Sequence, residues 1–417
     1  MTAGDRTVEH VTCLGCGCAC DDIAVVVRGS RIVEARNACA LGVPWFGDGT
    51  APDETRVQGR PAALEQALTE AARLLEAARR PLVYVAADVS CEVQRQAVAM
   101  ADRLHAVLDH LGATAAAGTL AAQRRGRAGA TLGELRQRAD VVVFWGVDPS
   151  ARYPRYASRY VVDAPGLDAP EGRRSRTVIA VDVGASRGPG DADRRVALAP
   201  ADEVDALGVM RAAVQGRTGA DDPRFEPAAE LARTLAAARY VTLVADGEPA
   251  AAPGDDDRAE ALVTLAQALN GPTRCALSTL RAGGNRAGAD AVLTWQTGFP
   301  FAADFARGTP DYRPHADAAA LLGAGEIDAA LVIGAVASLP APIAQGLAAL
   351  APVVIGPRAS AAPFRAAVAI DTGVAGIHEG GTGCRMDDVA LPLRAPLAGA
   401  RTALAVVSAL GERLARR

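Results

Sequence analysis

Five cysteines stand close together near the start of the chain. Four of them, Cys13, Cys16, Cys20 and Cys39, follow the spacing C-x2-C-x3-C-x18-C, and Cys18 lies inside the run. Three closely spaced thiolates with a distant fourth are the usual ligand set of a cubane [4Fe–4S] cluster, in which each iron takes one sulfur. Four thiolates also bind structural zinc, although zinc sites more often show two C-x2-C pairs. Thiols that no longer hold a metal are the third interpretation.

A sixth cysteine, Cys91, lies where a short apolar strand gives way to a predicted helix, with Ser90 as the helix N-cap. The N-terminus of a helix lowers the pKa of a thiol and favours a thiolate ligand. A single cysteine in such a place is more often a small buried residue. For acid–base chemistry the candidates are His315 and His378, and no two histidines have metal-ligand spacing.

Composition excludes several classes of chemistry. All 44 basic residues are arginine, so a Schiff-base lysine and a Walker-type phosphate lysine are excluded. The net charge of −4 gives no reason to expect a nucleic acid or an anionic membrane as partner. No apolar run reaches the roughly 20 residues of a membrane span, and the N-terminus shows no signal-peptide pattern. We therefore expect a cytoplasmic protein whose eight cysteines serve metal or catalysis rather than disulfides.

The elements expected to position these residues alternate between strands and helices. Continuous apolar strands separated by helices indicate α/β lobes with mainly parallel sheets behind a small Cys-rich, iron–sulfur type lobe. The predicted domains are residues 1–57 (cluster lobe), 58–225 and 226–395 (two α/β lobes) and 396–417 (C-terminal helix). The predicted strands are 23–27 and 31–35 (a hairpin), 82–87, 141–145, 178–183, 241–245, 329–333, 353–355 and 367–370, and the predicted helices are 62–78, 91–108, 202–214 and 401–416.

Several segments carry a resemblance to a known family. These segments look like parts of the B subunit of formylmethanofuran dehydrogenase, of the molybdopterin oxidoreductase superfamily. They are the segment from Thr12 to Ile23, Ser90-Cys91-Glu92-Val-Gln94, Phe144-Trp145-Gly146-Val-Asp148-Pro149 with Pro154-Arg155 and Ser158-Arg159-Tyr160, the segment from Trp295 to Phe301, and Glu379-Gly380 through Asp387. The resemblance covers roughly residues 8 to 395.

The resemblance implies cofactors and their ligands. It assigns a [4Fe–4S] cluster to Cys13, Cys16, Cys20 and Cys39, and it makes Cys91 a direct ligand of molybdenum or tungsten. It also implies that Gly146, Asp148, Pro149, Arg155 and Arg159 contact a molybdopterin guanine dinucleotide. For live redox chemistry the catalytic residues would be Cys91 and His378.

The chain departs from the family pattern at cofactor positions. Where the family tends to have Asp-Pro-Arg-x-Thr, residues 182–186 read Asp-Val-Gly-Ala-Ser. A Ser-Asp-Pro loop is replaced by residues 335–340, which contain no carboxylate, and a Gly-His-Tyr-Asn segment is replaced by residues 282–285, Ala-Gly-Gly-Asn. A buried polyanionic cofactor needs many fixed polar partners, so these losses predict a pocket that no longer binds it well.

The resemblance therefore leads to two functional hypotheses. In the first, the chain is the B subunit of a bacterial formyltransferase/hydrolase complex in tetrahydromethanopterin-linked one-carbon metabolism, a scaffold with a degenerate redox site. Its partners would be sister subunits of the A, C and D types, of which the A type hydrolyses the formyl group to formate and the D type transfers it. In the second, the chain is an active molybdenum or tungsten subunit that interconverts carbon dioxide and formate, with electrons relayed through the cluster.

Overall fold

The computed structural model describes residues 5–217, 222–247, 256–313 and 315–415. The chain forms two compact units: unit 1 combines Met1–Ala113 with Ala282–Arg417, and unit 2 is Thr114–Arg281. These units do not coincide with the lobes 58–225 and 226–395 predicted from the sequence. The reason is strand pairing, because strands from the first and last thirds of the chain join one sheet in unit 1.

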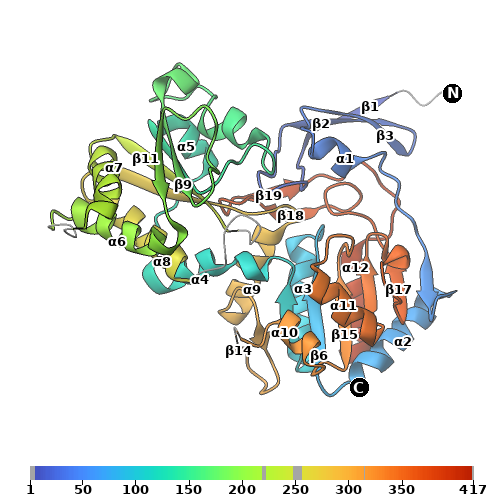
Figure 1. Ribbon diagram of the computed structural model, residues 1–417. Helices are drawn as coiled ribbons and strands as arrows, with labels where there is room; N and C mark the ends of the chain where they lie inside the picture. The colour runs from blue at the N-terminus through green and yellow to red at the C-terminus, as the bar shows by residue number, and fades with distance from the viewer. Residues whose placement is uncertain (1–4, 218–221, 248–255, 314, 416–417) are drawn as a thin grey trace. The chain divides into compact units, whose positions relative to one another are not determined.

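A mixed sheet of nine strands forms the centre of unit 1 (Figure 1). Its strands, in spatial order, are β14 (Asp311–Tyr312), β13 (Ala303–Asp304), β7 (Val107–His110), β6 (Pro81–Val85), β15 (Ala329–Ile333), β16 (Val353–Gly356), β17 (Val368–Asp371), β4 (Thr55–Val57) and β5 (Arg60–Pro61). The five central strands, from β7 to β17, run parallel. All five residues of β6 are buried, as expected for a strand covered on both faces.

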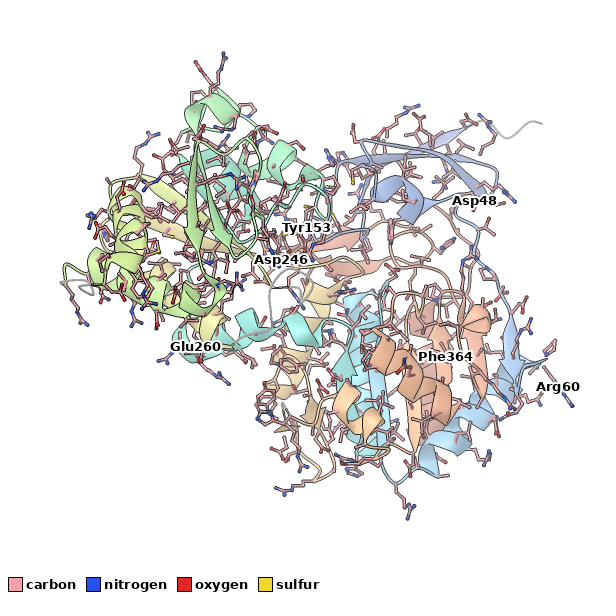
Figure 2. All side chains as sticks on the ribbon, in the orientation of Figure 1. Asp48, Arg60, Tyr153, Asp246, Glu260 and Phe364 are labelled. Carbon is pink, nitrogen blue, oxygen red and sulfur yellow. The ribbon has the colours of Figure 1, made fainter. Side chains whose placement is uncertain are left out.

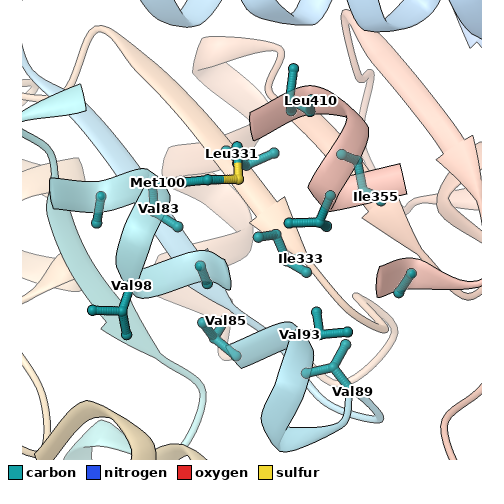
Figure 3. Close-up of a cluster of buried hydrophobic side chains, with 14 of the residues drawn as sticks. Val83, Val85, Val89, Val93, Val98, Met100, Leu331, Ile333, Ile355 and Leu410 are labelled. Carbon is teal, nitrogen blue, oxygen red and sulfur yellow. The ribbon is translucent and has the colours of Figure 1, made fainter. Parts of the chain in front are cut away.

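Alternating side chains of the central strands face two layers of helices. Val83 and Val85 of β6 face α2 (Leu64–Glu76), α3 (Cys91–Leu104) and α12 (Ala403–Ala415), and Figure 3 shows this core. Leu82 and Tyr84, on the opposite face, pack with α10 (Ala318–Gly323) and α11 (Ala341–Leu350). The sequence period of two thus provides both faces of the sheet with apolar side chains.

The order of the parallel strands reverses between β6 and β15. From β6 the chain continues through α3 to β7 on one side, whereas β15, β16 and β17 follow one another on the other side. Ligands of open α/β sheets bind outside the carboxyl ends of the strands at such a switch point. Cys91 follows β6 by a few residues and begins α3, so the switch point lies beside this thiol.

The N-terminal segment of unit 1 is a three-stranded antiparallel sheet. Its strands are β1 (Arg6–Val11), β2 (Ile23–Arg28) and β3 (Arg31–Arg36), and the predicted hairpin across Gly29-Ser30 is confirmed. Gly29 takes the positive φ of 62° that the tight turn requires. The short helix α1 (Gly42–Phe46) follows, and a second hairpin of unit 1 pairs β18 (Gly381–Cys384) with β19 (Ala390–Leu393).

Unit 2 contains a parallel sheet of five strands. Their order is β10 (Arg194–Leu198), β9 (Thr177–Val183), β8 (Val141–Trp145), β11 (Tyr240–Asp246) and β12 (Arg274–Leu280). Its helices are α4 (Ala117–Arg125), α5 (Leu132–Arg138), α6 (Glu203–Val214), α7 (Glu226–Ala236) and α8 (Asp256–Leu269), and a π-helical turn, η2, spans Tyr156–Val161. Here the strand order reverses between β8 and β11, which gives this unit its own switch point.

One predicted helix is wrong at its end. The helix expected over residues 91–108 ends at Leu104, because His105 adopts the left-handed conformation (φ 50°, ψ 38°) that terminates helices. The apolar residues that follow form β7 instead of a last helical turn. The helix α9 (Arg286–Thr297) completes unit 1. Within the described residues, no helix is both long and apolar enough to cross a bilayer.

Candidate functional site

The thiol of Cys91 lies at the first position of α3. Ser90 caps the helix, as predicted, by accepting a hydrogen bond from the backbone N–H of Val93. Cys91 is 5% exposed, so its surroundings are protein rather than bulk water. The strand β6, the loop after it and the cap therefore fix this sulfur beside the switch point of the unit 1 sheet.

A second cysteine, Cys384 at the end of β18, faces Cys91 with 3.9 Å between the two sulfurs. The side-chain amide of Asn285 also donates to the Cys91 sulfur, at 3.6 Å. The hydrogen bond from Cys384 lowers the pKa of the Cys91 thiol, and Asn285 adds to this effect while burial opposes it. The same contact raises the pKa of the Cys384 thiol. The two thiols are therefore not equivalent, because the pKa of Cys91 is lowered and that of Cys384 is raised.

Asn285 connects both segments of the thiol pair. Its Nδ2 donates to the carbonyl of Val89 at 2.9 Å, and its Oδ1 accepts the backbone N–H of Cys384 at 2.8 Å. Its own carbonyl accepts a hydrogen bond from Gln94 at 3.0 Å. Sequence reasoning noted Asn285 only as the end of a substituted segment and did not single out Cys384. No local pattern marks Cys384, because it meets Cys91 only through tertiary folding.

Glu92 links the first turn of α3 to β18 by hydrogen bonds. Its carboxylate accepts the backbone N–H of Thr382 at 2.9 Å and the Thr382 hydroxyl at 2.8 Å. Burial alone would raise the pKa of Glu92, but these hydrogen bonds outweigh burial and the pKa is lowered. Residues 91 and 92 therefore pair with residues 384 and 382, two positions that point to one face of β18.

The N-terminal cysteines are gathered in one loop of unit 1. A side chain placed on Gly42 would meet the sulfur of Cys13 at 3.4 Å and that of Cys39 at 3.9 Å, so the distant fourth cysteine lies beside the first. Burial raises the pKa of the Cys13 thiol, and Cys16, Cys20 and Cys39 raise it further. The structure thus places Cys39 near Cys13, whereas the convergence of all four thiols on one metal centre stays a prediction.

The cysteine loop turns without a positive φ at the glycines between its cysteines. Neither Gly15 nor Gly17 adopts one, and Ala19 (φ 38°) is the residue in the left-handed region. Gly15 is instead confined by space, since a Cβ there would lie 3.2 Å from Cβ of Trp45. The hydrogen bond from the Cys13 N–H to the Cys20 carbonyl, 2.9 Å long, closes the loop.

The thiols of this loop are not arranged as ligands of a single metal ion. Zinc would need its sulfurs about 2.3 Å from one point. Within residues 5–217, 222–247, 256–313 and 315–415, no three His, Cys, Asp or Glu side chains gather closely enough to hold one metal ion. A cubane takes one sulfur at each of four separate irons and so accepts more widely spaced thiols.

The cysteine loop packs directly on the segment that precedes α9. The N–H of Gly284 donates to the carbonyl of Leu14 at 2.7 Å, and the N–H of Asp88 donates to the carbonyl of Gly284 at 3.0 Å. A Cβ on Gly283 would lie 2.3 Å from the Leu14 oxygen and 2.7 Å from the Cys16 nitrogen. The Gly-Gly pair thus has a packing role: it lets the cysteine loop approach the loop between β6 and Cys91.

His378 and Glu379 make backbone contacts within unit 1. Nδ1 of His378 accepts the N–H of Val374 at 3.1 Å, Nε2 lies 2.8 Å from the Gly49 carbonyl, and burial lowers the pKa of the imidazole. Glu379 caps α12 by accepting the N–H groups of Ala403 and Leu404. Both ring nitrogens are thus engaged, and the catalytic role of His378 stays a prediction. His315, the other candidate, is exposed.

In unit 2, all five predicted dinucleotide contacts lie on the segment that leaves β8. Gly146 takes a φ of 65°, and Asp148 accepts the N–H of Ser150 at 2.9 Å beside Pro149. Arg155 directly precedes η2, in which the guanidinium of Arg159 covers the ring of Tyr160 at 4.8 Å. This segment therefore stands at the carboxyl end of a strand next to the switch point of unit 2.

Carboxylates of unit 2 bind several of the groups that an anionic ligand would need there. Asp246, buried at the end of β11, forms an ion pair with Arg152 (Figure 2). Glu203 accepts hydrogen bonds from Arg258 and from the indole of Trp145, each 2.7 Å long.

The loop after β9 is likewise held by its own chain. Asp182 accepts the backbone N–H groups of Arg187 and Gly188, at 2.9 and 3.0 Å, and pairs with Arg195. Backbone N–H groups at the end of a parallel strand are the usual donors to a phosphate. Here the Asp182 carboxylate accepts two such N–H groups.

Comparisons with known proteins agree with the sequence motifs. The chain is 32% identical over 406 residues to the B subunit of the tungsten-containing formylmethanofuran dehydrogenase 2 of Methanocaldococcus jannaschii, with 93% of each chain covered. It is also 32% identical over 296 residues to the B subunit of the formyltransferase/hydrolase complex of Methylorubrum extorquens, covering 69% of this chain and 75% of that one. No protein-family model matches the chain.

A solved structure extends the similarity to three dimensions. A chain in the crystal structure of the formyltransferase/hydrolase complex from Methylorubrum extorquens, determined with methylofuran, superposes with a TM-score of 0.72. The two chains are 29% identical, and the superposition covers 87% of this chain and 98% of the other.

Proposed function

The chain belongs to the family of formylmethanofuran dehydrogenase B subunits, and from that premise we propose that it is the B subunit of a formyltransferase/hydrolase-type complex. In this role it supports one-carbon chemistry linked to tetrahydromethanopterin, and it catalyses no reaction at molybdenum or tungsten itself. The family contains both redox-active and hydrolytic assemblies, so the proposal depends on features of this chain.

The charge balance at the carboxyl ends of the unit 2 strands is the observation that carries the proposal. A molybdopterin guanine dinucleotide is a polyanion, and each of its phosphates needs a cation or an N–H donor. In this unit Asp246 pairs with Arg152, Glu203 pairs with Arg258, and Asp182 takes two loop N–H groups. The residues do not fit the dinucleotide, because phosphates placed here would meet three carboxylates.

The surroundings of Cys91 support the same proposal. The Cys91 sulfur lies 3.9 Å from the Cys384 sulfur and accepts a hydrogen bond from Asn285, so protein groups already surround it. Glu92, the next residue, is committed to Thr382. Cys91 then acts as a buried residue of the core rather than as a metal ligand.

The spacing of the cysteines in the loop supports an iron–sulfur cluster. Cys13, Cys16, Cys20 and Cys39 would hold a [4Fe–4S] cluster, which supplies one-electron transfer when bound. In a subunit without redox turnover the cluster would serve as a structural staple for the small N-terminal lobe, which is too small to be stable through its own core. Burial and the neighbouring cysteines raise the pKa of the Cys13 thiol, and a bound metal centre would stabilise its thiolate form.

We further propose that the chain works only in assembly with sister subunits of the A, C and D types in the cytoplasm. Trp295 of α9 is 70% exposed, and tryptophan is enriched in the energetic centres of protein interfaces. A few residues after α9, Phe299 stacks on Tyr312 with ring centroids 5.2 Å apart. Size-exclusion chromatography of the chain with and without its partners tests assembly; a stable soluble monomer would argue against it.

An active molybdenum or tungsten subunit is the second candidate. The position of Cys91 at the switch point of the unit 1 sheet favours it, because a metal ligand belongs at such a site. In this alternative Cys91 would ligate the metal, and the cluster would pass electrons between formate and an acceptor.

Metal analysis of the purified complex separates the two candidates. We expect iron in stoichiometric amount and neither molybdenum nor tungsten, together with formate release from a formylated carrier. One molybdenum or tungsten per complex would reject the proposal in favour of the second candidate.

A further inference from the structure

The contact between Cys91 and Cys384 joins two segments that lie 293 residues apart in the chain. Both side chains are buried, with exposures of 5% and 6%, and each comes from regular structure, the first turn of α3 and the last residue of β18. A sulfur–sulfur distance of 3.9 Å is a van der Waals contact. A disulfide would shorten this distance to about 2.05 Å.

The surrounding contacts hold the two thiols in register. Glu92 accepts hydrogen bonds from the N–H and the hydroxyl of Thr382. Asn285 donates to the carbonyl of Val89 and accepts from the N–H of Cys384. Each contact ties the helix start to the strand within two residues of a thiol. This preorganisation lowers the entropy that two free thiols would lose on linking.

We propose that Cys91 and Cys384 form a reversible disulfide, so that the position aligned with the family metal ligand is a two-electron redox site made of protein sulfur alone. With a hydroperoxide as oxidant, the Cys91 thiolate attacks the terminal peroxide oxygen, the O–O bond breaks and Cys91 becomes a sulfenic acid. The Cys384 sulfur then attacks the sulfenic sulfur and expels water. With hydrogen peroxide, two thiols and one peroxide yield one disulfide and two water molecules.

The disulfide would lock the start of α3 to β18 and remove Cys91 as a potential thiolate ligand. A thiol reductant reverses it by exchange through a mixed disulfide. This inference goes beyond the scaffold function and can fail independently of it. If the complex contains no molybdenum or tungsten but the two thiols never link, the disulfide proposal is wrong and the proposed function stands.

The sequence allows a direct test by peptide mapping. Trypsin cleaves after arginine but not before proline, so Cys91 falls in peptide 80–95 and Cys384 in peptide 366–385, each with no second cysteine. The full chain, purified in its complex, is treated with hydrogen peroxide, alkylated under denaturing conditions and digested without reductant. We expect peptides 80–95 and 366–385 to be linked, and to separate again after dithiothreitol.

Two variants complete the test. Cys384→Ala should abolish the linked peptide and drive Cys91 to irreversible sulfinic acid, because its resolving thiol is gone. Cys275→Ala is the matched control, since Cys275 is also buried but lies in unit 2, and the linked peptide should remain. The proposal is overturned if wild-type peptides 80–95 and 366–385 stay unlinked at peroxide doses that oxidise other thiols. It is equally overturned if Cys91 links to a cysteine other than Cys384.

Discussion

Replacing Gly283 with alanine tests whether the segment before α9 is a packing element rather than a damaged cofactor loop. Its φ is not in the left-handed region, so alanine meets no backbone strain and the cost arises from overlap alone. The new Cβ would lie 2.3 Å from the Leu14 oxygen and 2.7 Å from the Cys16 nitrogen, both backbone atoms that cannot rotate away. Overpacking of this kind costs about 1–3 kcal/mol, and rigid neighbours on two sides place this case near 3 kcal/mol.

The matched control is Gly208→Ala. Gly208 is in the interior of α6 in unit 2, and a Cβ there meets nothing within 4 Å. Alanine should therefore stabilise that helix by about 0.5–1 kcal/mol. Urea unfolding followed by circular dichroism compares the two variants, and iron content reports on the cysteine loop. We expect Gly283→Ala to lower the unfolding midpoint and the bound iron together. Equal midpoints for the two variants would refute the packing argument.

Three further predictions concern the thiols and one buried ion pair. Cys91→Ser should leave formate release by the complex unchanged and cost about 1–3 kcal/mol of stability, as expected for a buried group whose partners are disturbed; loss of turnover would favour the molybdenum or tungsten enzyme. Cys13→Ser should remove most of the iron from the purified complex, whereas Cys275→Ser should retain it, and equal iron in both would contradict the cluster assignment. Asp304→Asn should cost about 3 kcal/mol near neutral pH, because Asp304 is 3% exposed and accepts two hydrogen bonds from Arg80. Burial opposes ionisation of Asp304, but these bonds lower its pKa below the usual value. The contribution of the carboxylate is therefore present above the unfolded pKa of about 3.9 and is lost as the pH falls through the lower folded pKa. Unfolding of wild type and variant at several pH values should show their difference shrinking in that acidic range.

Local patterns predicted much of the secondary structure. The strands 141–145 and 329–333 agree with β8 and β15 at both ends, because a short continuous apolar run between Asp and Gly is typical of a buried strand. The N-cap Ser90 and the hairpin at Gly29 could be predicted from the sequence because each depends only on neighbouring residues. The end of α3 was not, because nothing in the apolar residues 106–108 separates a helical turn from a buried strand.

The sequence also showed that cofactor motifs had been lost, but it did not show which contacts replaced them. The segment 282–285 showed that a histidine had gone, whereas the structure shows that Gly283 lets the chain approach Leu14 and Cys16. Asp182 and Asp246 gave no sign in sequence that they would bind loop N–H groups and Arg152. The N–H partners of Asp182 lie in the loop after its own strand, whereas Arg152 reaches Asp246 only because β8 and β11 are neighbours in the sheet.

The sequence by itself determined the family, the alternation of strands and helices, the cysteine loop with its spacing, and Cys91 at a strand-to-helix junction, because each is written in residues close together in the chain. The tertiary structure alone decided the assembly of the nine-stranded sheet from both ends of the chain and the meeting of Cys91 with Cys384. Those contacts join positions hundreds of residues apart, and their free energy comes from burying apolar faces that local propensity cannot pair. The chemistry available to Cys91 therefore depends on a partner that no neighbouring residue predicts.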